Sequence, residues 1–217
     1  MSETPESPAA HPRAEKPEFL TEQRFDEFAL PAQLQSALKE AGFVYCTPIQ
    51  EQTLPISLSG LDVAGQAQTG TGKTAAFLVT VITRILTFSD RDPRLPAALI
   101  VAPTRELSHQ IYEEARTLCR HADLKIAEVV GGIDYKRQAD ILRRGTDIVI
   151  CTPGRIIISS MDSLNPKASK CWLSMRPIGC LIWGSPKICA FCSGNSPPMI
   201  RASPCSFRPR FLIGLWS

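Results

Sequence analysis

A glycine-rich segment in the first half of the chain has the residue types of a phosphate-binding loop. It reads Ala67-Gln68-Thr69-Gly70-Thr71-Gly72-Lys73-Thr74, between a short apolar run and a longer amphipathic one. Glycines let the backbone curl until its N–H groups converge on phosphate oxygens, and the start of the next helix adds partial positive charge. Lys73 could then reach the β- and γ-phosphates, and the Thr74 hydroxyl could ligate Mg²⁺. The segment therefore predicts a site for a nucleoside triphosphate.

The alternative for this segment is a glycine-rich turn with an exposed lysine. Ala67 stands where the general pattern of phosphate loops has glycine, so the match is incomplete at that position. The context favours the loop, because a predicted strand precedes the segment and a predicted helix follows it.

An aromatic ring and a glutamine upstream could bind the base of a nucleotide. The segment Gly42-Phe43-Val44-Tyr45-Cys46-Thr47-Pro48-Ile49-Gln50 ends in the glutamine, and Phe25 lies seventeen positions before Gly42. A glutamine amide can donate to and accept from the N6 and N7 edge of adenine, and an aromatic ring can stack on the base. The alternative is a helix entry surrounded by core aromatics, because apolar aromatic side chains are usually buried.

The elements that must position these residues follow from the alternation of short apolar and longer amphipathic runs. A helix is predicted after Pro31, ending at Gly42, and Thr47-Pro48 predicts a second helix start that runs to about Leu58. Further strands are predicted at 61–67, 97–102, 125–130 and 147–151, and helices at 73–88, 105–121 and 135–144. Nearly all-apolar strands in alternation with helices indicate an α/β fold, a parallel sheet with helices on both faces.

Ligands of such sheets bind at the carboxyl ends of the strands, and the candidate motifs all lie at such ends. The sheet is expected to stop at the strand that ends near Cys151. Val101, Val149 and Ile150 would then be partly uncovered and one strand edge left open, so marginal folding is expected. Residues 1–18 are expected to be disordered, because prolines interrupt any periodicity and few apolar side chains offset the entropy of ordering.

Together, these segments resemble the DEAD-box ATP-dependent RNA helicases over about residues 19–158. The family's Q motif is matched by Phe25, Gly42-Phe43 and Thr47-Pro48-Ile49-Gln50, and its motif I by Ala67–Thr74. Its motif Ia resembles Pro103-Thr104-Arg105-Glu106-Leu107, its GG element Gly131-Gly132, and its motif Ib Thr152-Pro153-Gly154-Arg155. The form Cys46-Thr47-Pro48, with Asp62-Val63-Ala64-Gly65-Gln66 before the loop, is similar to the bacterial degradosome-type branch of the family.

The resemblance implies an N-terminal RecA-like domain with ATP and Mg²⁺ as cofactors, RNA as a partner and a ribonuclease of the RNA-degradation machinery as a further partner. It implies catalytic roles for Lys73 and Thr74, with Thr74 also holding Mg²⁺ through ATP. The implied ATP site consists of Phe25, Thr47, Gln50, Ala67, Gln68, Thr69, Gly70, Thr71, Gly72, Lys73 and Thr74. The implied RNA site consists of Pro103, Thr104, Arg105, Gly131, Gly132, Thr152, Pro153, Gly154 and Arg155.

The chemistry of the proposed RNA residues is consistent with a track for one strand. Thr104, Arg105, Thr152 and Arg155 lie where strands end and helices begin, so N–H, hydroxyl and guanidinium groups could hold successive phosphates. Phosphate contact without base contact gives binding that is independent of sequence and sensitive to salt. The alternative is a set of ordinary turns with capping threonines and solvated arginines.

Several catalytic parts of the family are not found in these 217 residues. No Asp-Glu-Ala-Asp string occurs, and Asp162 is the one acidic residue after Asp147. The family's Ser-Ala-Thr motif and its second RecA-like domain with an arginine finger are also missing. Mg²⁺ would be under-ligated and the attacking water would lack a base, so we expect no hydrolysis by this chain alone. The alternative function is a non-catalytic nucleotide- or RNA-binding module.

Residues 159–217 differ in composition from residues 1–158. They hold seven basic residues and one acidic residue, a net charge of +6, whereas residues 1–158 hold 17 basic and 20 acidic residues, a net charge of −3. All three tryptophans and five of the eight cysteines also lie there. From Cys171 onward, a shifted reading frame can be formed from the third base of each codon and the first two bases of the next codon. Codons that the amino-acid sequence permits then encode Leu-Val-Ile-Asp-Glu-Ala-Asp in the shifted frame. We therefore hypothesise a frameshift between about Arg155 and Cys171 and a poorly ordered tail.

Two alternatives for the tail are a metal site around Cys189 and Cys192 and a basic, tryptophan-bearing RNA-binding segment. Elsewhere, His109 and His121 have no metal-ligand partners in the pattern, and Cys46, Cys119 and Cys151 are too widely spaced for a metal site. The chain has no run of 18 apolar residues, which argues against a transmembrane helix, and no apolar leader at its start. A cytoplasmic protein is the expectation.

Overall fold

The computed structural model describes residues 17–61, 63–67, 70–87 and 96–155, and beyond them the backbone of three strands at 171–175, 180–184 and 212–214. Most of both predicted tails, including the two cysteines of the alternative metal site, lies outside these residues. Within the described part, no helix combines the length and the apolar composition needed to cross a membrane.

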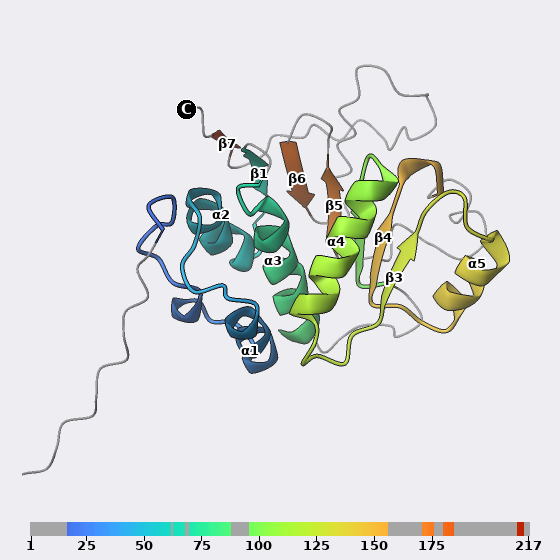
Figure 1. The fold of residues 1–217 in the computed structure, drawn as a ribbon, viewed down its shortest axis with the longest axis horizontal. Helices are drawn as coiled ribbons and strands as arrows, with labels where there is room; N and C mark the ends of the chain where they lie inside the picture. Colours follow the sequence, from blue (N-terminus) through green and yellow to red (C-terminus); the bar gives the residue numbers. More distant parts are fainter. Residues whose placement is uncertain are drawn as a thin grey trace, which may run out of the picture.

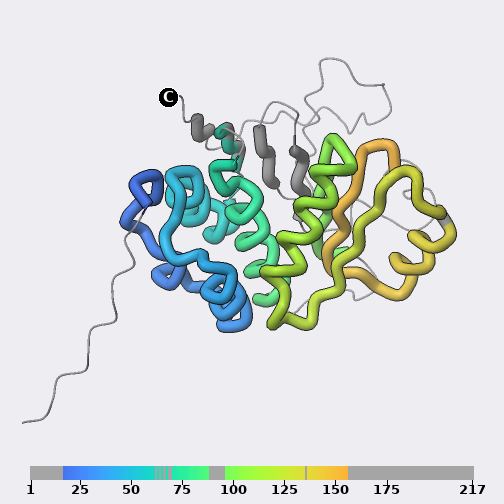
Figure 2. Tube along the Cα trace, in the orientation of Figure 1, coloured from blue at the N-terminus to red at the C-terminus, as the bar shows by residue number. Residues whose placement is uncertain are grey.

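A helical unit precedes the sheet. The short 3-10 helix η1 (Phe25–Glu27) is followed by α1 (Ala32–Glu40) and α2 (Pro48–Leu58). As predicted, Thr47 is the N-cap of α2 and Pro48 its first residue. The chain before α1 is hydrogen-bonded to the segment before α2. The backbone N–H of Thr21 donates to the Cys46 carbonyl at 2.8 Å. In Figure 2 this blue part lies beside α3, on the side away from β3 and β4.

The remaining elements alternate as the sequence predicts, with shorter bounds (Figure 1). They are β1 (Val63–Gln66), α3 (Lys73–Thr87), β2 (Ala98–Val101), α4 (Arg105–Leu118), β3 (Ile126–Val129), α5 (Tyr135–Arg143) and β4 (Ile148–Cys151). Three strands follow, β5 (Cys171–Met175), β6 (Cys180–Gly184) and β7 (Leu212–Gly214). The order in the sheet is β3-β4-β2-β5-β6-β1-β7.

The sheet is parallel from β3 to β5, which confirms the predicted fold class, while β6 runs antiparallel to both of its neighbours. The expectation that the sheet stops at β4 is wrong. β4 lies between β3 and β2, and the other edge of β2 pairs with β5. Val149 and Ile150 are therefore fully buried rather than partly uncovered, whereas Val101 is half-buried.

The strands send alternate side chains into two helical layers, because successive residues of a strand point to opposite faces. Ile100 and Ile150 belong to the larger core, which includes side chains of α1, α3 and α4. Leu99 and Val149 belong to a smaller core that includes Leu142 of α5. Helices therefore pack on both faces of the sheet, as the sequence predicts.

Candidate nucleotide and RNA site

The predicted phosphate loop follows β1 and opens α3, which is the context that the sequence predicts. Gly70 and Gly72 both have positive φ, 83° and 82°. The backbone therefore turns sharply before the first helical residue, Lys73. Gln68 and Thr69 of the predicted loop lie outside the described residues.

Gln50 ties the predicted base-binding segment to this loop. Its Nε2 donates to the Gly72 carbonyl at 3.0 Å, and its Oε1 accepts from the Thr47 N–H at 2.8 Å. The side chain is only 1% exposed. A Cβ atom at Gly72 would lie 2.4 Å from Gln50 Nε2, so the loop approaches the glutamine as closely as glycine allows.

Lys73 lies over the loop rather than in solvent, which is the arrangement expected of a phosphate-binding lysine. Its Nζ donates to the Ala67 carbonyl, and the residue is 8% exposed. Burial lowers the pKa of Lys73, because an ammonium loses hydration there. A phosphate oxygen bound beside it would favour the charged ammonium. Thr74, in the same first turn of α3, is half-buried.

Phe25 is part of the core. Its ring is 2% exposed and meets the Phe43 ring edge-on, with centroids 5.8 Å apart and planes at 79°. This matches the alternative that the sequence left open for the aromatics. The ring fixes the segment that carries Gln50, and a base could stack on it only if that segment moved.

A second site is an open hollow of about 550 Å³ at the carboxyl ends of β2, β3 and β4. All of its lining residues belong to the predicted RNA site. They are Pro103, Thr104, Arg105, Gly131, Thr152, Pro153, Gly154 and Arg155. Three turns that are far apart in the sequence therefore meet at one edge of the sheet.

Gly132 is the predicted RNA residue that does not line this hollow. Its φ is 86°, and a Cβ atom there would lie 2.7 Å from Arg105 Nη1. At Gly131 the corresponding distance to Arg105 Nη2 is 3.0 Å. The two glycines thus make room for the Arg105 guanidinium, and Gly131 alone also borders the hollow.

Backbone contacts hold the other two turns of the hollow in place. Thr104 is the N-cap of α4, and its hydroxyl accepts from the Leu107 N–H at 3.2 Å. Arg155 Nη2 donates to the Ile133 carbonyl at 2.9 Å, which joins the turn after β4 to the turn after β3. The capping role predicted as the alternative for the threonine is therefore present together with the hollow.

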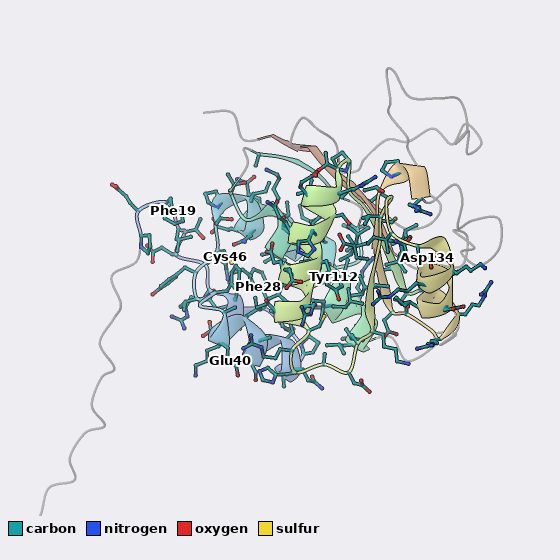
Figure 3. The ribbon with its side chains drawn as sticks, turned by 45° about the vertical axis from the view of Figure 1, so that its right-hand side comes forward. Phe19, Phe28, Glu40, Cys46, Tyr112 and Asp134 are labelled. Atoms are coloured by element: carbon teal, nitrogen blue, oxygen red, sulfur yellow. The ribbon has the colours of Figure 1, made fainter. Side chains whose placement is uncertain are left out.

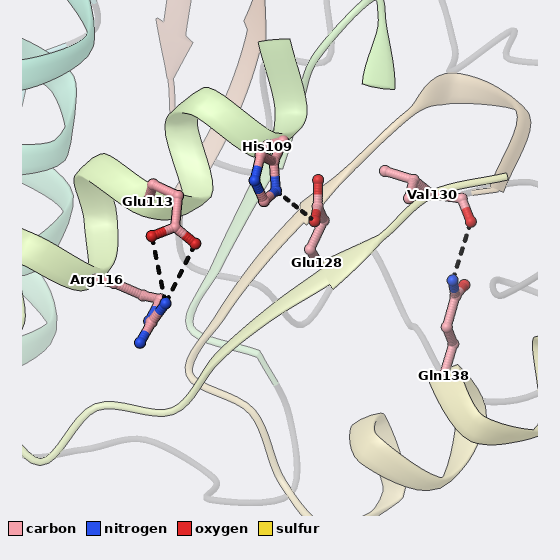
Figure 4. Close-up of polar contacts among 6 residues, drawn as sticks. All are labelled: His109, Glu113, Arg116, Glu128, Val130 and Gln138. Atoms are coloured by element: carbon pink, nitrogen blue, oxygen red, sulfur yellow. Dashed lines mark hydrogen bonds and ion pairs between the residues drawn. The ribbon is translucent and has the colours of Figure 1, made fainter. Parts of the chain in front are cut away.

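Sequence reasoning missed Gln138, a buried residue of α5. Its Nε2 donates to the Val130 carbonyl at 2.9 Å, which anchors α5 behind the Gly131 turn (Figure 4). A single polar residue within the apolar stripe of the helix, beside Ala139 and Leu142, is the signal that could have found it.

The other reactive side chains do not form sites in the described part of the chain. Cys46, Cys119 and Cys151 are buried free thiols, and burial raises the pKa of Cys46 and of Cys119 to about 12. His109 lies on the surface 3.4 Å from Glu128 (Figure 4). No group of three or more histidine, cysteine or acidic side chains is gathered for a metal ion among the described residues.

A protein-family model described as DEAD/DEAH box helicase matches residues 47–180. The chain belongs to the DEAD/DEAH box helicase family. The ATP-dependent RNA helicase RhlB of Xanthomonas campestris pv. campestris (strain B100) is 52% identical over 141 residues, 64% of this chain and 25% of that protein. RhlB of Enterobacter sp. (strain 638) is 50% identical over 141 residues, which cover 34% of its length. This DEAD-box chain therefore spans about a quarter to a third of these relatives.

Two solved structures resemble the DEAD-box chain in fold. A DEAD box protein from Methanococcus jannaschii aligns with a TM-score of 0.61 and 34% identity, covering 68% of this chain and 39% of that one. A hypothetical ATP-dependent RNA helicase from Sulfolobus tokodaii aligns with a TM-score of 0.57 and 34% identity, covering 64% of this chain and 39% of that one.

The described residues fit the triphosphate of ATP better than they fit Mg²⁺. The turn through Gly70 and Gly72, the start of α3 and the ammonium of Lys73 together suit phosphate oxygens. For the metal, Thr74 is the one residue that the sequence predicts as a ligand. Most remaining ligands of a magnesium ion would therefore be phosphate oxygens and water.

Proposed function

We propose that this chain is the ATP-binding part of an RNA helicase of the RhlB type, which binds ATP at the loop before α3 and one RNA strand in the hollow. The hollow carries the proposal, because all of its lining residues come from three separate turns that resemble RNA-contacting motifs. The family membership and the RhlB relatives support the same function.

In the proposed ATP site, each residue has a separate task. Gly70 and Gly72 turn the backbone N–H groups toward the phosphates, and Lys73 exchanges the Ala67 carbonyl for a phosphate oxygen. Thr74 would hold Mg²⁺, which supplies charge neutralisation to the phosphates when bound. Gln50 holds the loop through Gly72 and could offer its second amide hydrogen to a base.

In the proposed RNA site, backbone N–H groups and two arginines hold phosphates. Arg105 is held against the glycine turn, and Arg155 is tied to the Ile133 carbonyl, so both guanidiniums are partly ordered before RNA arrives. Contacts of this kind do not read bases. Binding should therefore be independent of sequence and should weaken as salt rises.

We further propose that this chain binds ATP without hydrolysing it. Its sequence has no Asp-Glu-Ala-Asp string to position the metal and the attacking water. The hypothesised frameshift explains this absence, and the nucleotide sequence between codons 150 and 180 tests it directly.

The absence of the Asp-Glu-Ala-Asp string also favours the second candidate function, a non-catalytic nucleotide- or RNA-binding module. A ribonuclease of the RNA-degradation machinery remains a proposed partner.

The test is a titration of the purified chain with a fluorescent ATP analogue, followed by phosphate release with and without RNA. Lys73→Ala should abolish analogue binding, whereas Lys39→Ala, an exposed lysine of α1, should not. Analogue binding that survives Lys73→Ala would overturn the loop assignment. RNA-stimulated phosphate release would overturn the proposed inactivity.

A further inference from the structure

The outer face of α5 carries cations that no ion pair in the described structure neutralises. Lys136, Arg137 and Arg144 are all exposed and have no salt-bridge partner among the described residues. Neither of the two acidic residues nearby forms an ion pair with these side chains, since Asp134 accepts from the backbone N–H of Lys136 at 3.0 Å and Asp140 pairs with Arg143 at 3.0 Å.

These cations have a fixed direction because the inner face of α5 is anchored. Gln138, Ala139 and Leu142 are buried, and Gln138 donates to the Val130 carbonyl (Figure 4). At 100° per residue, Arg137 and Arg144 lie opposite that stripe and within about 20° of each other. The rise of an α-helix separates their Cα atoms by roughly 10 Å along the axis. They form one ridge that faces away from the sheet.

Helix stability does not explain the start of this ridge. Lys136 and Arg137 lie in the first turn of α5, where the helix dipole favours acidic residues, and no acidic residue lies in that turn. Arg144, at the C-cap, is where the dipole favours a cation. At this end Asp134, the N-cap, supplies one negative charge, whereas Lys136 and Arg137 supply two positive charges.

The ridge continues from the hollow. Arg155 of the hollow donates to the Ile133 carbonyl, two residues before α5 begins, and Gly131 borders the hollow two residues before that. Asp134, labelled beside α5 in Figure 3, is the N-cap of that helix and follows the carboxyl end of β3 by five residues. A strand that leaves the hollow past Arg155 therefore meets the first turn of α5 next.

We propose that Arg137 and Arg144 extend the RNA track along α5, as a second phosphate-binding segment beyond the hollow. This inference rests on the proposed function, because it assigns the same RNA strand a longer path. Unpaired cations in a row suit a phosphodiester backbone, which presents evenly spaced charges. An acidic protein segment is the other polyanion that this surface could bind, and the continuity with the hollow favours RNA.

The test compares binding of two oligouridylates, one of about six nucleotides and one of about twelve, sizes within the range that single-strand-binding surfaces cover. The double variant Arg137→Gln/Arg144→Gln should weaken binding of the longer oligonucleotide by about fivefold per arginine at 0.1 M salt, and lower its salt slope by about 0.7 for each lost contact. Binding of the shorter oligonucleotide should be unchanged.

A charge-matched control is Arg116→Gln/Arg120→Gln, which removes two exposed arginines that are already paired with Glu113 and Glu40. It should leave both oligonucleotides bound as tightly as by the unchanged chain. Circular dichroism would check that α5 is intact in the test variant.

The possible failures are distinguishable. If neither oligonucleotide binds the unchanged chain, or if Arg105→Gln has no effect on the shorter one, the proposed function fails. If Arg105→Gln weakens both but Arg137→Gln/Arg144→Gln weakens neither, the extension along α5 is overturned. If the α5 variant instead loses binding of a glutamate-rich peptide and keeps RNA binding, the ridge is a protein-docking surface and the inference is wrong.

Discussion

At the scale of single residues, two independent constraints exclude a side chain at Gly72. Its φ of 82° lies in the left-handed region, and a Cβ atom would lie 2.4 Å from Gln50 Nε2. Gly70 has nearly the same φ, 83°, and apart from its chain neighbours no atom of the described residues lies within 4 Å of a Cβ placed there. A side chain at Gly70 would therefore cause backbone strain alone, whereas a side chain at Gly72 would cause both strain and a steric clash.

We predict that Gly72→Ala destabilises the fold more than Gly70→Ala. The strain of a left-handed alanine costs about 1 kcal/mol in either variant. Only Gly72→Ala also displaces Gln50, whose two hydrogen bonds contribute about 1 kcal/mol each. Urea denaturation of both variants, and of Gly72→Ala/Gln50→Ala, measures the difference. Equal losses in the two single variants would contradict the Gln50 contact.

Glu114 of α4 gives a prediction of pH dependence. Burial raises the pKa of its carboxyl to about 7, from 4.5. Between these values the unfolded chain releases the proton while the folded chain keeps it, so the free energy of unfolding falls as pH rises. The shift sets an upper limit of about 3 kcal/mol to this loss at pH 8.

Glu114→Gln should therefore stabilise the chain at pH 8 and have little effect at pH 5. Thermal unfolding at both pH values measures this, with Glu113→Gln as control, because Glu113 is exposed and paired with Arg116. If the stability of the Glu114→Gln variant and of the unchanged chain depends on pH in the same way, Glu114 is not the cause of the loss of stability at high pH.

At the scale of elements, periodicity and capping residues predicted the helices and strands well. Thr47 and Pro48 start α2 as expected, because their effect depends on neighbours in the sequence. The hollow was also predictable, since parallel strands bring their carboxyl ends to one edge. The contacts across turns were not. Arg105 lies against Gly131 and Gly132, and Arg155 donates to the Ile133 carbonyl. These contacts depend on the conformations of long side chains, which no local sequence pattern predicts.

The expectation for the sheet edge failed for a related reason. The apolar pattern of residues 147–151 shows that a strand forms, but it does not show which strands lie beside it. β4 is interior because β3 covers one of its edges and β2 covers the other. The pairing of β2 with β5 joins segments about 70 residues apart, which the unusual composition of the last part of the chain did not suggest.

At the scale of the whole molecule, the continuity of the sheet depends on β5. Leu173 is in register with Ile100 of β2 on one side and with Trp183 of β6 on the other. Since β5 is paired on both edges, its backbone N–H groups are needed by one neighbour or the other. Among the described strands, β6 and β5 lie between β2 and β1, the strand that leads into the phosphate loop.

We predict that Leu173→Pro lowers the free energy of unfolding by about 3 kcal/mol, because proline removes an N–H from a central strand and its ring opposes the ladder. Leu173→Val keeps the N–H and a β-favouring side chain, so it is the matched control. Because β1 leads into the phosphate loop, the same variant should also weaken binding of the fluorescent ATP analogue. Urea denaturation and the analogue titration give the two readings. If Leu173→Pro matches Leu173→Val in both, the cooperative fold ends at β4, as the sequence alone suggested.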